Sequence, residues 1–155
     1  MSRLLSSEFT GWIDNDGHMH KVLIPDAVAT KFQEEKVRRV QAWLKGYGPI
    51  HRALSVNSGQ TFLYLSKSTM KEIDLLAFEE VQVRISEDTT TYQAPEPVEW
   101  MELMSQDEEI KHRFEAVTDG KKRAILFAVS RPKSSDARLR KALSIADELR
   151  MGTIQ

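Results

Sequence analysis

The sequence contains no cysteine, so a disulfide scaffold and a metal site built on thiolates are both excluded. It also lacks a long apolar run. The longest uninterrupted one, residues 124–129, is far shorter than the roughly 20 residues that span a bilayer. The first residues show no signal-peptide core. We therefore expect a cytoplasmic protein with no membrane insertion.

Charge of one sign is not in excess either. Against 22 Lys and Arg residues stand 23 Asp and Glu residues, for a formal net charge of −1. This balance gives no general attraction to nucleic acid or to an anionic membrane, so binding to either needs a local basic patch. The chain has 155 residues, of which 41% are hydrophobic. That length suffices for one compact domain or for two small ones that share a core.

Up to about residue 88, apolar and polar residues alternate, which is typical of strands. The alternation is clear at Val40, Ala42 and Leu44. Residues 57–60, with the sequence Asn-Ser-Gly-Gln, predict a tight hairpin between strands at 50–56 and 61–65, because Asn and Gly tolerate positive φ. Short helices are expected at 25–32 and 66–74, the second capped by Ser66.

Residues 23–44 and 64–85 share one pattern at a constant offset of 41. Each segment has the pattern of a strand, a short helix and a strand, and their apolar positions coincide, as at Ile24 and Leu65. We therefore expect an internal strand-helix-strand duplication. Two such units that close on each other leave no exposed sheet edges, which favours a small closed or split β-barrel over residues 1–90. The alternative is an antiparallel sheet capped by two helical turns.

After a connector at residues 91–97 the periodicity becomes helical. Residues 98–155 predict a C-terminal cluster of three to four short helices packed on the barrel, so the expected fold class is α+β. The second helix is expected to start at a Ser105 capping box, and the third to cover residues 119–130. The fourth starts at Ser134 or Ser135 and ends at Gly152. Its expected apolar stripe consists of Leu139, Ala142, Leu143, Ala146 and Leu149.

Charge inverts within this half. Residues 96–115 carry a balance of −5 and residues 120–141 a balance of +7. The start of the last helix is the candidate site for an anion or an anionic partner, because helix-end N–H groups and flanking cations hold phosphate or carboxylate. The candidate residues are Lys133, Ser134, Ser135, Arg138, Lys121 and Arg123. The alternative is a solvated basic face, with Asp136 at the helix start paired to Arg140.

No catalytic signature is present. His18 and His20 form half of a metal site, but no second ligand pair has suitable spacing. His51 and His112 are isolated, and no Ser or Cys stands in a nucleophile motif. Residues 46–49 lack the Lys-Ser/Thr of a phosphate loop, so they predict a turn. We expect no enzymatic activity, no metal and no cofactor.

Trp12 and Trp43 lie on predicted strands. Tryptophan on a strand of a small barrel is more often a core or barrel-mouth residue than a residue that stacks on a ligand. We therefore interpret both as core or barrel-mouth residues.

Two stretches of the C-terminal half, residues 118–123 and 129–146, resemble the signature of the YdeI/OmpD-associated, or bacteriocin-protection, family. The similarity lies in a Gly-Lys-Lys-Arg helix start and in Lys133-Ser-Ser-Asp-Ala-Arg-Leu-Arg-Lys-Ala-Leu. The first half resembles the domain of unknown function 1905 at residues 24–26, 48–50 and 81–83. Phe78 stands where that domain has Gly, and Phe resists the positive φ that Gly adopts there.

This resemblance implies a double-split barrel of the type seen in AbrB/MazE-like regulators, with a small helical appendage and no assigned reaction. We therefore expect a non-enzymatic binding or interaction protein of the bacteriocin-protection type. Its partner is an unidentified small anionic ligand or a protein, and its expected state is a monomer or a homodimer. The alternative is a nucleic-acid-binding regulator, which the barrel analogy and the basic segment suggest.

Overall fold

The structure is a computed structural model, which describes residues 4–154. The chain divides into two compact units, Met1–Thr89 and Thr90–Gln155. Each unit has a hydrophobic core of its own. Strands form most of the first unit and helices form the second, so the fold class is α+β, as expected.

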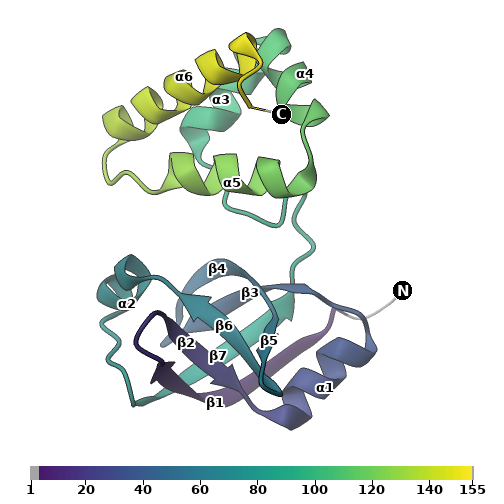
Figure 1. Cartoon of the computed structure of the whole chain (residues 1–155), viewed down its shortest axis with the longest axis vertical. Helices are drawn as coiled ribbons and strands as arrows, with labels where there is room; N and C mark the ends of the chain where they lie inside the picture. Colours follow the sequence, from purple (N-terminus) through teal and green to yellow (C-terminus); the bar gives the residue numbers. More distant parts are fainter. Residues whose placement is uncertain (1–3, 155) are drawn as a thin grey trace. The chain divides into compact units, whose positions relative to one another are not determined.

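A curled antiparallel sheet of seven strands, in the order β4-β3-β7-β1-β2-β6-β5, forms the first unit (Figure 1). The strands are β1 (Ser6–Asn15), β2 (His20–Ile24), β3 (Arg39–Leu44), β4 (Tyr47–Ala53), β5 (Ser55–Asn57), β6 (Gln60–Leu65) and β7 (Glu80–Glu87). The expectation of one strand over residues 50–56 was wrong, because the strand is interrupted at Leu54. Before this interruption β4 pairs with β3, and after it β5 pairs with β6.

Two short helices interrupt the strands. They are α1 (Asp26–Glu34), preceded by Pro25, and α2 (Lys67–Ile73). Ser66 caps α2 as predicted, since its Oγ accepts from the N–H of Thr69 at 3.1 Å. Phe32 and Met70 carry the apolar side of the two helices into the core that the strands build.

Two turns of this unit contain residues with positive φ. Ser58 and Gly59, with φ of 52° and 77°, join β5 to β6 in the geometry of a type I′ turn, which confirms the predicted hairpin. Phe78 also has positive φ, at 65°. Its N–H donates to the O of Ile13 at 2.7 Å, and the O of Glu79 accepts from the N–H of Ile13 at 2.9 Å. These two bonds hold the turn in a conformation that a Phe side chain disfavours.

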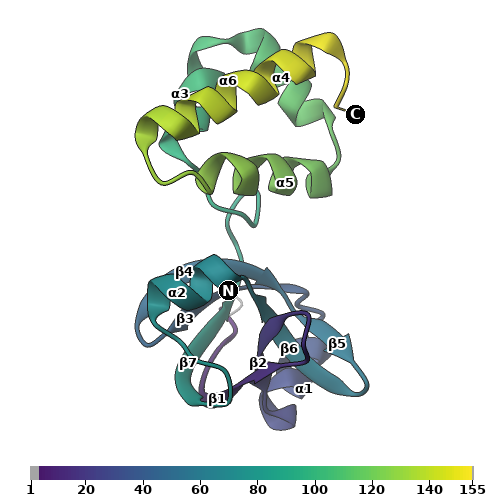
Figure 2. The ribbon, with the colours of Figure 1, turned by 60° about the vertical axis from the view of Figure 1, so that its left-hand side comes forward.

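The second unit contains α3 (Val98–Gln106), α4 (Glu108–Ala116), α5 (Asp119–Ser130) and α6 (Ser135–Met151). The longest of them, α6, contacts the other three (Figure 2). Trp100 and Phe114 meet edge to face in the core, with ring centroids 5.4 Å apart. No helix within residues 4–154 is both long and apolar enough to cross a bilayer.

Two sequence expectations for the helices were wrong. The Ser105 side chain does not cap α4: α3 continues through Gln106, and Asp107 Oδ1 accepts from the N–H of Ile110 instead. On α6, Leu139 and Leu143 are 44% and 46% exposed. The buried face of α6 therefore excludes both leucines and consists of Ala142, Ile145, Ala146 and Leu149.

Candidate functional site

A gap opens in the sheet of the first unit where β1 and β2 separate. β1 pairs with β7 from Ser6 to Trp12, but it pairs with β2 only from Trp12 to Asn15. The chain leaves β2 at Pro25, which has no N–H to donate to a neighbouring strand, and enters α1. The two strands therefore diverge on the Thr10 side of Trp12.

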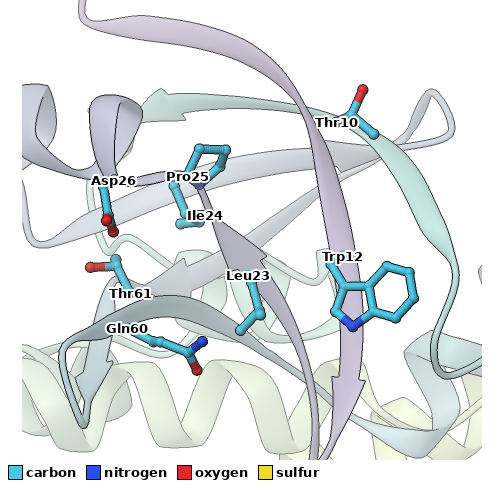
Figure 3. A pocket seen from close by; sticks show the side chains of 8 residues that line it. All are labelled: Thr10, Trp12, Leu23, Ile24, Pro25, Asp26, Gln60 and Thr61. Atoms are coloured by element: carbon cyan, nitrogen blue, oxygen red, sulfur yellow. The ribbon is translucent and has the colours of Figure 1, made fainter.

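A pocket of about 300 Å³ lies at this gap (Figure 3). It is lined by Thr10, Trp12, Leu23, Ile24, Pro25, Asp26, Gln60 and Thr61. Trp12 and Leu23 are cross-strand neighbours on the outer face of the sheet, and the Trp12 side chain is 43% exposed. Trp12 is thus a pocket residue and not part of the core. Trp43 also lies outside the core, where the guanidinium of Arg84 covers its ring at 3.8 Å from the centroid.

The polar side chains of the pocket differ in whether they already have a hydrogen-bond partner. Thr10 Oγ1 accepts from Gln82 Nε2 at 2.8 Å, and Thr61 Oγ1 accepts from Gln33 Nε2 at 3.2 Å. Among the described residues, the side chains of Asp26 and Gln60 have no hydrogen bond or ion pair. An apolar floor with one carboxylate and one amide at the rim suits the binding and orientation of a small group.

His51 and Asp88 form a buried pair in the same unit. Nδ1 of His51 lies 2.6 Å from Oδ2 of Asp88, and both residues are buried. The sequence interpretation of His51 as isolated was therefore wrong. Nothing in the spacing of residues 51 and 88 indicates this contact, because it depends on β4 and the end of β7 lying on either side of β3. The described residues contain no group of three or more His, Cys, Asp or Glu that could hold a metal.

At the start of α6, a carboxylate of the chain itself occupies the site predicted for an anion. Glu99 Oε1, which is buried on α3, accepts from Arg138 Nε at 2.7 Å and from Ser135 Oγ at 3.3 Å. Arg138 also donates to the O of Pro132 at 3.0 Å. Ser134 caps α6 by accepting from the N–H of Ala137. The hydrogen bond from Arg138 lowers the pKa of Glu99 most, and its own backbone N–H lowers it further.

Two other candidate residues, Lys121 and Arg123, lie on a different helix from this cluster. Both residues lie in the first turns of α5. At a rise of 1.5 Å per residue, Lys121 lies roughly 14 Å along the helix from the loop between α5 and α6. Lys133 is exposed in the loop before α6. The basic residues of segment 120–141 are therefore spread over α5, the following loop and the start of α6, and they do not form one cluster.

Comparison with models of known protein families gives no match for this chain. A search of curated proteins also gives no significant match. The resemblance to the bacteriocin-protection family therefore stays a prediction.

Proposed function

We propose that the chain is a non-enzymatic binding protein of the bacteriocin-protection type, and that its ligand site is the pocket at the β1–β2 gap. The observation that carries this proposal is the pocket itself, with the exposed Trp12 ring on one wall and the unengaged Asp26 and Gln60 side chains at the rim. The start of α6 is a weaker candidate, because Glu99 already engages Arg138 and Ser135 there.

We also propose that the first unit is a duplicated, double-split barrel, and the strand registers support this. A shift of 41 residues converts several of the observed pairings into other observed ones. Phe9 pairs with Val83, for example, and the shifted pair is Ile50 with Ala42, which is also observed. Likewise, the pairing of Asp14 with Lys21 corresponds to that of Ser55 with Phe62.

The same offset relates β1 to the continuous segment of β4 and β5. β1 changes its partner from β7 to β2, and the β4–β5 segment changes its partner from β3 to β6. The two residues of a pair are 41 positions apart in Val22–Leu63 and in Trp43–Arg84. The offset therefore exchanges the two residues of each pair, as expected for pairs that lie on a two-fold axis. The duplication then includes residues 6–44 and 47–85, and each half has one split.

A fragment screen on the full-length protein tests the function. ¹⁵N NMR would follow the indole N–H of Trp12 and the amides of Leu23 and Gln60 against a set of cationic, neutral and anionic fragments. We expect saturable shifts at the pocket signals with at least one fragment. In Trp12→Ser the shifts should disappear, whereas Tyr64→Ser is the matched control, because Tyr64 is equally exposed on the outer face but does not line the pocket.

The nucleic-acid alternative is tested on the same sample with random duplex DNA at several salt concentrations. A regulator that neutralises phosphates binds with a steep salt dependence. Pocket signals that no fragment moves would overturn the proposal, whether or not DNA binds. DNA binding through the residue 120–141 signals alone would support the alternative function.

A further inference from the structure

One of the two splits in the sheet, between β4 and β6, is closed by a side chain. Arg52 Nε donates to the O of Tyr64 on β6 at 2.9 Å, and Nη2 donates to Thr69 Oγ1 on α2 at 3.3 Å. Nη1 donates to the O of His51 at 2.8 Å. A planar guanidinium suits this position because it presents several N–H donors in one fork to acceptors on both sides.

Gly11 stands at the position equivalent to Arg52 under the 41-residue offset. It pairs with Val81 as Arg52 pairs with Val40. A Cβ atom on Gly11 would lie 2.6 Å from Cγ2 of the buried Val22, so this side chain leaves no room for a larger residue at position 11. The same Cβ would lie 3.4 Å from the O of Leu23, the counterpart of Tyr64, whose O accepts from Arg52. Because Gly11 has no side chain, it does not bridge the gap between β1 and β2 as Arg52 bridges the gap between β4 and β6. The pocket lies at this split (Figure 3).

The backbone around the pocket repeats two of the three acceptors that Arg52 uses, whereas Val28 stands at the position equivalent to the third, Thr69. Ile13 directs both its N–H and its O toward the β7 side of β1. Alternate residues of an antiparallel strand point their backbone groups to opposite sides, so Thr10 directs its O toward the side where β2 has diverged. Thr10 is the counterpart of His51, whose O accepts from Arg52. The O of Leu23 has two lone pairs, so it accepts a further donor even when it is paired with β1.

Two side chains add to these backbone acceptors. Asp26 places a carboxylate on the pocket wall, and the equivalent position in the other half is Lys67. Trp12 contributes an exposed ring, and a cation over an indole face is attracted by the ring's quadrupole. An anion at this position would be repelled by Asp26, whereas a cation would gain an ion pair.

We propose that the pocket binds a guanidinium or ammonium group of a partner, in the place that the guanidinium of Arg52 fills in the other half. This inference rests on the proposed function of the same pocket. The acceptors are the O of Thr10, the O of Leu23 and the carboxylate of Asp26, with Trp12 packed against the bound group.

Three probes on the full-length protein test this inference: agmatine, the capped tripeptide alanyl-arginyl-alanine amide, and the same peptide with the neutral isostere citrulline. NMR would follow the Trp12 indole N–H and the amides of Leu23 and Asp26. We expect saturable shifts with the two guanidinium probes and none with the citrulline peptide. Tighter binding of the arginine peptide than of agmatine would identify a protein segment as the source of the cation. Equal affinity would identify a free small guanidine or amine.

Asp26→Asn should weaken binding of the arginine peptide about fivefold, the effect of losing one exposed ion pair. Glu34→Gln, at the other end of α1, is the matched control and should leave the affinity unchanged. Equal binding of the citrulline peptide, or an unchanged affinity in Asp26→Asn, would overturn the inference. If neutral or anionic fragments occupy the pocket and cations do not, the cation assignment fails while the proposed function stands. If no probe or fragment moves the pocket signals, both fail.

Discussion

Arg138 holds Glu99 across 39 residues of sequence, with Nε of the arginine 2.7 Å from Oε1 of the glutamate. Glu99 is only 7% exposed, and the hydroxyl of Ser135 donates to the same oxygen. The N-terminal end of α6 thus meets an anion supplied by α3. Arg138, one of the basic residues that suggested a site for an external anion, stabilises the contact between two helices of the second unit.

The Glu99–Arg138 pair predicts a dependence of stability on pH. The hydrogen bond from Arg138 lowers the pKa of folded Glu99 below its ordinary value of 4.5. The pair therefore stabilises the fold fully above that value, and its contribution is lost as the pH falls through the lower folded pKa. Glu99→Gln should lower the Tm at pH 7, and the difference from the unmodified chain should shrink in acid. Glu102→Gln, exposed on the same helix, is the control. A difference that is constant with pH would contradict the ion pair.

The buried contact between His51 and Asp88 should be sensitive to loss of the carboxylate. Asp88→Asn is expected to lower the free energy of unfolding by about 1–3 kcal/mol, because a buried partner loses a charge-assisted bond. Urea unfolding with an unchanged m value is the measurement. The matched control is Ser86→Ala, a buried polar residue near the end of β7 and two residues before Asp88. The buried Ser86 Oγ has no hydrogen-bond partner among the described residues, so removing it should leave stability unchanged or raise it. Equal losses in both variants would contradict this prediction.

The hairpin turn predicts opposite effects of two substitutions. Gly59 has φ of 77°, so Gly59→Val should lower the free energy of unfolding by more than about 1 kcal/mol, because β-branched residues disfavour positive φ. Ser58→Asn should raise it slightly, since Asn-Gly is the favoured pair for a type I′ turn. Thermal unfolding of both variants measures this. A Gly59→Val protein with an unchanged Tm would refute the turn geometry.

Phe78 is an exposed aromatic residue held at φ of 65°. Asn tolerates this conformation better than Phe does, and Val tolerates it worse. We expect Phe78→Asn to be at least as stable as the unmodified chain, and Phe78→Val to be less stable by about 1 kcal/mol. Chemical unfolding of the pair gives the order. The reverse order would mean that the Phe78 ring stabilises the fold by contacts that outweigh the backbone strain.

Sequence alone predicted the features that neighbouring residues decide. Ser66 caps α2 as expected, and Ser134, one of the two residues predicted for the start of α6, caps that helix. Each cap bond joins a hydroxyl to an N–H three residues later. The hairpin at Ser58 and Gly59 was equally predictable from its two turn residues. The bounds of α5, residues 119–130, were also predicted, with Pro132 as the residue that stops the helix.

Sequence patterns failed where two helix faces compete for burial. Leu139 and Leu143 are more apolar than Ala142 and Ala146, yet the two alanines are buried and the two leucines are exposed. Close contact between helices favours small side chains at the contact line, and periodicity alone does not say where that line runs. Only the packing of α6 against α3, α4 and α5 decides which side is buried.

Sequence by itself determined the fold class, the Ser66 cap and the hairpin, because these depend on local bonds and on the alternation of apolar residues. Tertiary structure alone decided the contacts between distant residues. His51 meets Asp88 across 37 residues, and Glu99 meets Arg138 across 39. The pocket likewise joins β1, β2, the start of α1 and the start of β6. Strand order and helix packing set these distances, and no local pattern records them.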